Sequence, residues 1–289
     1  MTNSIIQDLR STIKNGDMLI KLIFVNSAVF VIFRIIYLFY FLSGQPFTLG
    51  YWMSLPSDPA GLLYKPWTLV TYMFYHEGLL HFFFNVLNLY WFGKIFLLYF
   101  DEKKLLSIYL LGGLTGGLFY FAVYNLLPNI FPPAILLGAS ASVIAILFAV
   151  AFYAPNFKVF MVFVGEVKLI YIAIFSLLLY VILIASDNPG GNLAHIGGAL
   201  FGYLWVRRYQ RGRDITRGFG KFLESFFALF KRRKMKVTYK RPVSDMDYNH
   251  KKNIDQQEID RILDKISKAG YGSLSKDEKD ILFRMSNKN

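Results

Sequence analysis

The chain has 289 residues, of which 55% are hydrophobic and only 18% are charged, and its mean hydropathy is +0.39. A soluble domain of this length cannot bury so much apolar surface, so most of the chain is expected to face lipid. The absence of cysteine excludes disulfides, thiolate zinc sites and a cysteine nucleophile. The formal net charge of +13 indicates contact with anionic groups.

Six apolar stretches are long enough to cross hydrocarbon, which takes ~20 residues with a range of ~17–25. They are Leu19–Leu42, Leu80–Tyr99, Leu105–Leu127, Gly138–Ala154, Lys168–Ser186 and Leu193–Tyr209. The predicted fold class is therefore all-α, a polytopic membrane protein built on a bundle of six transmembrane helices. We expect residues 1–17 to form an N-terminal cytoplasmic segment and residues 18–210 to form the membrane domain.

Basic residues fall on one set of loops, as expected for cytoplasmic loops. The members of this set are Arg10, Lys14, Lys21, Lys103, Lys104, Lys158 and Lys168. The alternate loops contain Lys65 alone. This asymmetry predicts an integral membrane protein with both termini cytoplasmic, and we expect it in a bacterial inner membrane.

The long first outer loop, residues 44–78, is rich in tryptophan, tyrosine and proline. Aromatic residues concentrate at the membrane interface, so this loop is expected to lie in the headgroup region. A plain exposed loop with scattered aromatics is the alternative.

A basic run follows the last apolar stretch. From Arg207 to Arg241 the chain carries thirteen Lys and Arg against Asp214 and Glu224, a net charge of +11. We expect residues 207–241 to bind anionic lipid. Nucleic-acid binding is the competing interpretation, but no nucleic-acid motif accompanies the charge, so no such partner is predicted. Within residues 211–241, phenylalanines at helical spacing over Thr216–Lys234 predict an amphipathic interfacial helix.

Residues 242–289 have a soluble composition and are predicted to form a small cytoplasmic helical hairpin. One apolar stripe contains Ile259, Ile262, Leu263 and Ile266. Gly270 and Gly272 interrupt it, and Ser275 with Glu278 forms a capping box that opens a second helix.

Four polar residues share one depth in the predicted bundle. The second, fourth and sixth segments all run inward, and each carries its polar residues near its outer end: His81 and Asn85, Ser140, and His195. Polar groups within a membrane are expensive and are functional candidates by default. Gly198 and Gly202 lie on the same helical face as His195 and permit a close neighbouring helix.

This combination predicts nucleophilic catalysis. His195 could take the proton of the Ser140 hydroxyl, and Asn85 and His81 could stabilise an oxyanion. Neither segment carries an acidic residue in its outer half, so a dyad is favoured over a triad, and no metal or cofactor is predicted. The site should open outward to admit water, past a set of candidate lining residues: Thr71, Tyr72, His76, Glu77 and Asn192.

Each residue alone also has a structural explanation. Ser140 could be a small packing residue, and the histidines and Asn85 could bond between helices. The glycines Gly112, Gly113, Gly116 and Gly117 are interpreted as packing residues only. The ordered combination at one depth favours chemistry.

The chain resembles the rhomboid family of intramembrane serine proteases. The similarity lies in His76, His81-x-x-x-Asn85, Gly138-Ala139-Ser140, and Ala194-His195-x-x-Gly198-x-x-x-Gly202, and it covers residues 19–209. It implies a six-helix rhomboid-like bundle with Ser140 as nucleophile and His195 as base. It further implies that His81, Asn85 and the Ser140 amide form the oxyanion hole, that His76, Gly138, Gly198 and Gly202 line or pack the site, and that the substrates are membrane proteins.

Three positions depart from the family pattern. Ala141 replaces the glycine after the serine, and Ile144 replaces an aromatic residue one turn later, so something else must orient the imidazole. Thr68 stands where a basic residue commonly follows the loop tryptophan, so the loop must be anchored differently.

Two other classes of function stay open at this point. A non-catalytic, rhomboid-like client-binding protein would have no need for both Ser140 and His195. A transporter or channel would need a polar path through the whole membrane, whereas the inner halves of the segments are nearly all apolar. The sequence assigns no oligomeric state.

Overall fold

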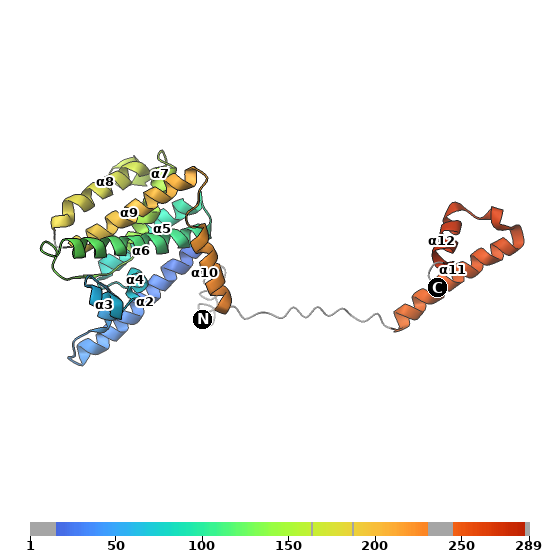
Figure 1. Ribbon diagram of the computed structural model, residues 1–289, viewed down its shortest axis with the longest axis horizontal. Coiled ribbons are helices and arrows are strands. Elements are labelled where there is room, and N and C mark those ends of the chain that lie inside the picture. The colour runs from blue at the N-terminus through green and yellow to red at the C-terminus, as the bar shows by residue number, and fades with distance from the viewer. Residues whose placement is uncertain (1–15, 163, 187, 231–244, 287–289) are drawn as a thin grey trace. The chain divides into compact units, whose positions relative to one another are not determined.

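The computed structural model describes residues 16–162, 164–186, 188–230 and 245–286. The described chain is mostly helical and forms two compact units, residues 1–231 and 232–289 (Figure 1). The predicted N-terminal segment, except its last two residues, and the basic run from Lys231 to Arg241 lie outside the described residues.

All six apolar stretches contain a helix. They are α2 (Met18–Leu42), α5 (Leu79–Leu97), α6 (Glu102–Leu126), α7 (Ser140–Tyr153), α8 (Leu169–Ile182) with η3 (Leu183–Ala185), and α9 (Pro189–Gln210). Three begin at a side-chain cap: Asp17 accepts from Ile20 N, Asp101 from Lys104 N, and Asn188 from Gly191 N. Each cap satisfies a backbone N–H that the first helical turn leaves without a partner.

Among the described helices, α2 and α6 are long and apolar enough to cross a membrane on that basis alone. α7 and the α8–η3 run are apolar but shorter. α5 and α9 have 19 and 22 residues, and their composition is diluted by polar residues such as His81, Asn85 and His195. The count of six spans therefore rests on the sequence prediction, and three of its members, α5, α7 and α9, carry the polar residues singled out above.

The core of the larger unit is α7, which is buried from Ala141 to Ala151 and packs mainly against α9 and α6. Small residues permit this proximity. A Cβ built on Gly112 would meet the Ala145 side chain, and one on Gly116 would lie 2.6 Å from the Ala141 Cβ. The packing role predicted for the glycines of α6 is correct.

The outer loop folds into short elements: η1 (Leu49–Trp52), β1 (Leu55–Pro56), α3 (Pro59–Tyr64), α4 (Thr68–Thr71) and η2 (Tyr72–Phe74). β1 pairs antiparallel with β2 (Ile135–Leu136), with Leu55 opposite Leu136. Gly138 N donates to Tyr72 O at 2.9 Å. The loop thus fixes the segment that leads into α7.

Lys65 anchors this loop. Its Nζ donates to Tyr51 O at 2.9 Å and lies 3.2 Å from the centre of the Tyr51 ring. Trp67 stacks on Trp52, and Thr68 Oγ1 donates to Lys65 O at 2.6 Å. Burial lowers the pKa of Lys65, and the nearby Asp58 raises it by a smaller amount. Thr68 replaces the basic residue that commonly follows the loop tryptophan, so a different anchor was expected. That anchor is Lys65, which is buried and lies two residues before Trp67.

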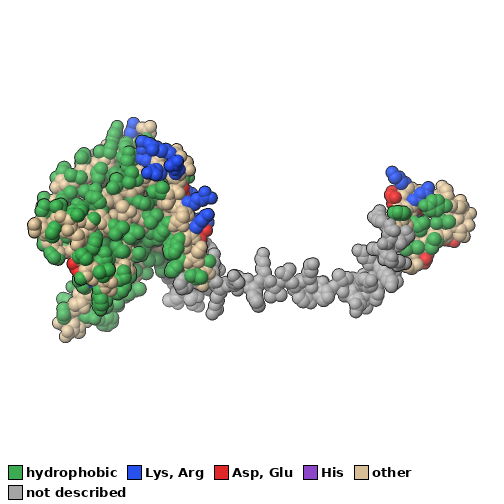
Figure 2. Space-filling view, viewed as in Figure 1, with side chains coloured by type: hydrophobic (Ala, Val, Ile, Leu, Met, Phe, Trp, Pro, Cys, Tyr) green, Lys and Arg blue, Asp and Glu red, His purple; other side chains and the backbone are tan. Residues whose placement is uncertain are grey.

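β3 (Lys158–Met161) and β4 (Gly165–Lys168) form an antiparallel hairpin between α7 and α8. α10 (Arg217–Phe230) follows α9 and is joined to α6 by an ion pair between Glu224 and Lys103 at 2.5 Å. The visible face of this unit is mostly hydrophobic, with Lys and Arg gathered where α9 ends (Figure 2).

The smaller unit contains α11 (Asp245–Ala269), η4 (Tyr271–Ser273) and α12 (Lys276–Ser286). Gly270 ends α11 with a φ of 76°, and the predicted capping box is present. Ser275 N donates to Glu278 Oε2 at 2.7 Å, and Glu278 N donates to Ser275 Oγ at 3.3 Å. The two predicted helices, the glycine break between them and the capping box are therefore observed, while the cytoplasmic location of this unit stays a prediction.

Candidate active site

Ser140 is the first residue of α7 and follows a turn that only glycine accommodates. Gly138 has a φ of 107°, and a Cβ built on it would lie 2.6 Å from His81 Cε1. Any other residue would be strained by its backbone and would also displace His81. The turn therefore places the Ser140 hydroxyl and the His81 ring close together.

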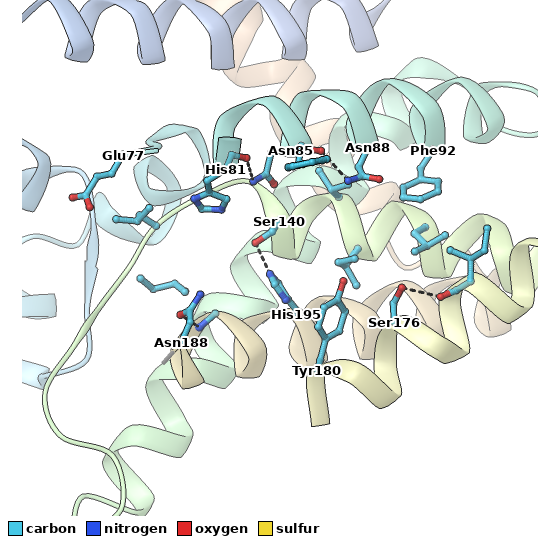
Figure 3. A pocket seen from close by; sticks show the side chains of 18 of the residues that line it. Glu77, His81, Asn85, Asn88, Phe92, Ser140, Ser176, Tyr180, Asn188 and His195 are labelled. Atoms are coloured by element: carbon cyan, nitrogen blue, oxygen red, sulfur yellow. Dashed lines mark hydrogen bonds between the residues drawn. The ribbon is translucent and has the colours of Figure 1, made fainter. Parts of the chain in front are cut away.

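His195 lies on α9 and contacts Ser140 directly. Its Nε2 is 2.6 Å from Ser140 Oγ (Figure 3). A Cβ built on Gly198 would lie 2.2 Å from the carbonyl oxygen of Ala141. A Cβ built on Gly202 would lie 2.2 Å from the carbonyl oxygen of Ala145. The two glycines predicted to admit a neighbouring helix thus let α9 approach the backbone of α7, and this approach joins the two side chains.

The other side of His195 faces an aromatic ring from α8. The centroid of the Tyr180 ring lies 4.4 Å from that of the imidazole, with the planes at 57°. His195 Nδ1 is buried and has no hydrogen-bond partner among the described residues. Tyr180 was not among the predicted site residues, although it lies near the C-terminal end of the fifth apolar stretch, which the predicted topology puts at the level of Ser140 and His195.

His81 and Asn85 lie on α5, one turn apart, and face Ser140 across the pocket (Figure 3). Asn85 Nδ2 donates to His81 O at 2.9 Å. Since a side-chain amide carries two N–H groups, the second can donate into the pocket. The predicted oxyanion donors are therefore placed beside the hydroxyl.

His76 supports the serine turn from behind. It is buried, and its Nε2 accepts a hydrogen bond from Ala139 N at 3.3 Å. Its ring centroid is 5.3 Å from that of His81. Of the two roles predicted for His76, packing is the one observed.

The pocket has a volume of about 630 Å³ and extends between α5 and α8. Its lining includes His81, Asn85, Ser140, Tyr180 and His195, together with Glu77 as expected.

For three other residues the predicted lining role is wrong. Their side chains instead donate hydrogen bonds to backbone carbonyl groups. Thr71 Oγ1 donates to Met53 O at 3.0 Å, the Tyr72 hydroxyl to Gly113 O at 2.6 Å, and Asn192 Nδ2 to Leu183 O at 2.6 Å. None of the three lines the pocket.

The methyl group of Ala141 fits into the contact between α6 and α7 without forcing the helices apart. It faces Gly116 of α6, which has only a hydrogen at that position. Ile144 lines the pocket one turn after Ser140, while the aromatic contact to the imidazole comes from Tyr180 instead.

The arrangement can carry out acyl transfer. A hydroxyl lies within hydrogen-bond distance of an imidazole nitrogen, and side chains that can donate face the same pocket. A helical membrane domain with a hydrogen-bonded serine and histidine at one end of its bundle is the class that this fold and site define.

Comparison with known proteins gives the same class. Residues 64–211 match the rhomboid domain, and residues 244–288 match a family of unknown function (DUF6576). The chain belongs to the rhomboid family and is a membrane protein. It is 28% identical over 216 residues to RHOMBOID-like protein 12, mitochondrial, of Arabidopsis thaliana, a match that covers 70% of this chain and 61% of that relative.

Proposed function

We propose that this chain is an intramembrane serine endopeptidase that cleaves transmembrane or membrane-proximal segments of membrane proteins. The observation that carries the proposal is the 2.6 Å contact between His195 Nε2 and Ser140 Oγ. A protein that only binds clients has no physical need for this contact.

The reaction follows from the positions of the groups. His195 Nε2 takes the hydroxyl proton while Ser140 Oγ attacks the scissile carbonyl carbon. The oxyanion accepts hydrogen bonds from Asn85 Nδ2, a ring N–H of His81 and the Ser140 amide at the start of α7. The imidazolium then protonates the leaving amine, and water hydrolyses the acyl-enzyme.

The proposal includes a topology. Six helices cross the membrane with both termini cytoplasmic, and the start of α7 lies near the outer face, where water can enter. The smaller unit is then a cytoplasmic hairpin. A bacterial inner membrane fits this orientation, and the relative that is named as mitochondrial makes an organelle membrane the alternative.

Labelling of the purified full-length protein with a fluorophosphonate probe tests the nucleophile. We expect the native protein to be labelled and Ser140→Ala to be unlabelled. Ser142→Ala is the matched control, because Ser142 is two residues further along the same helix and buried, and it should be labelled like the native protein. Equal labelling of the native protein and Ser140→Ala would exclude Ser140 as the nucleophile.

Substrate cleavage in liposomes separates the two rhomboid-like functions. A protease cuts a single-span substrate, and Ser140→Ala retains binding without cleavage. Capture of that substrate by the native protein without cleavage or probe labelling would favour a client-binding protein instead.

We also propose that residues 207–241 bind anionic lipid. Phe222, Phe226 and Leu229 are exposed on α10, while Arg208, Arg211 and Arg213 line one hollow nearby. An amphipathic helix with a basic surround is typical of a membrane interface. The test is to purify the protein from membranes that contain both neutral and anionic lipid and to measure the lipid that stays bound. The double variant Arg211→Gln, Arg213→Gln should retain a smaller fraction of anionic lipid than the native protein. Unchanged retention would exclude these two arginines.

A further inference from the structure

The imidazole of His195 is held from two sides by two different helices. On one side its Nε2 contacts Ser140 of α7, and on the other its ring contacts Tyr180 of α8 at a centroid distance of 4.4 Å (Figure 3). Both contacts come from helices other than its own, so the orientation of the base is set by tertiary packing.

The second nitrogen of the imidazole gives it little further support. Nδ1 is buried and has no hydrogen-bond partner within the described part of the chain. A ring fixed by one hydrogen bond can still turn about its side-chain torsions, and an error of ~1 Å in the position of a reacting group can cost ~10²-fold in rate. The Tyr180 ring lies against the imidazole, with a centroid distance of 4.4 Å, and so limits rotation of the imidazole toward α8.

Tyr180 also bears on the charge that forms during reaction. When His195 takes the serine proton it becomes a cation, and a cation within ~6 Å of an aromatic centroid is attracted by the ring face. The observed separation of 4.4 Å is well within this limit. The same side chain that contacts the neutral base therefore also lies within this distance of its protonated form, with the two ring planes inclined at 57°.

The contact is specific rather than a consequence of a fully buried helix. The buried residues of α8 are Leu169 and Ala173, both in its first two turns. Around Tyr180 the helix exposes Leu178, Val181 and Ile182. Tyr180 is only partly exposed itself, because its ring turns inward and lines the pocket.

We infer that Tyr180 is a positioning residue for His195, which it holds in line with Ser140. The inference rests on the proposed protease function. It assigns to α8 a part in aligning the base in addition to lining the pocket.

The test compares Tyr180→Leu and Tyr180→Phe in the full-length protein. Without the ring, kcat should fall by about tenfold or more while KM changes by less than about twofold, and the rate of fluorophosphonate labelling should fall in parallel. Tyr180→Phe keeps the ring and should retain activity within about threefold of the native value. Tyr171→Leu changes an exposed tyrosine of the same helix and should behave like the native protein.

Thermal unfolding of each variant separates positioning from folding. If Tyr180→Leu unfolds at a lower temperature, Tyr180→Met provides a flexible side chain of similar reach for the same comparison. Native labelling rates in the ringless variants, or an increase in KM with kcat unchanged, would overturn the inference and leave Tyr180 as a lining residue. Absence of labelling in the native protein would instead refute the proposed function.

Discussion

His195 Nε2 lies 2.6 Å from Ser140 Oγ although 55 residues separate them in the chain. The contact depends on Gly198 and Gly202, whose positions face the backbone carbonyl oxygens of Ala141 and Ala145. Because these glycines lie three and seven residues after His195, the spacing of the helices and the spacing of the two reactive groups are set by the same face of α9.

Gly198→Ala should therefore impair both packing and chemistry. The new methyl group would fall on the Ala141 carbonyl oxygen, so α7 and α9 must separate. We expect ~1–3 kcal/mol of destabilisation from overpacking and a loss of turnover of about 10²-fold from misplacement of the base. Thermal unfolding and substrate cleavage measure the two effects.

Gly218→Ala is the matched control for this change, because a Cβ at that position of α10 has no atom within 4 Å. It should leave both quantities unchanged. Full activity in Gly198→Ala would show that the helix spacing does not control the reactive pair.

The serine and the histidine should act as one unit. We expect Ser140→Ala and His195→Ala each to lower kcat by about 10²–10⁴-fold. The double variant should be no worse than the more damaging single one, because removing either member already abolishes proton transfer. Additive losses in this cycle, measured with one substrate in liposomes, would mean that the two residues contribute independently.

Asn85 provides a test of oxyanion stabilisation. Asn85→Ala removes a donor that faces Ser140 and should lower kcat by about 10²–10³-fold with a small change in KM. Asn85→Asp has nearly the same shape but places an acceptor, and at neutral pH a negative charge, where the oxyanion forms, so it should be the slower variant. If the aspartate variant were as active as the native protein, Asn85 would have no electrostatic part in the reaction.

The sequence predicted the parts of this site that depend on local pattern. Each of the six apolar stretches contains a helix, and the structure brings His81, Asn85, Ser140 and His195 to one pocket, as the predicted alternation of direction required. Small residues on α6 and α9 gave the close helix contacts. These features repeat within one helix, so their spacing is visible in the chain.

Contacts between distant segments could not be predicted in the same way. Tyr180 is one of many aromatic residues, and which of them meets the imidazole depends on how α8 is rotated. The loop residues Thr71 and Tyr72 were misplaced because competing backbone acceptors capture their hydroxyls. Arg34, within the first apolar stretch, received no role, yet its guanidinium donates to the backbone carbonyl of Glu77 beside the pocket.

The capping box of the smaller unit predicts a dependence of its structure on pH. Hydrogen bonds from the Lys265 side chain and from Ser275 N lower the pKa of Glu278 from 4.5 to about 2. Because the folded pKa is the lower one, the charged carboxylate stabilises the fold above pH 4.5, and this contribution is lost as the pH falls toward about 2. Hydrogen-exchange protection of the α12 amides in the full-length protein, corrected for intrinsic rates, should therefore decrease over this interval.

Glu278→Gln should show weaker protection at neutral pH and little dependence on pH. Asp280→Asn, a change at an exposed acid of the same helix, should retain the native profile. Native protection at pH 3 would mean that the Glu278 carboxylate does not hold the start of α12.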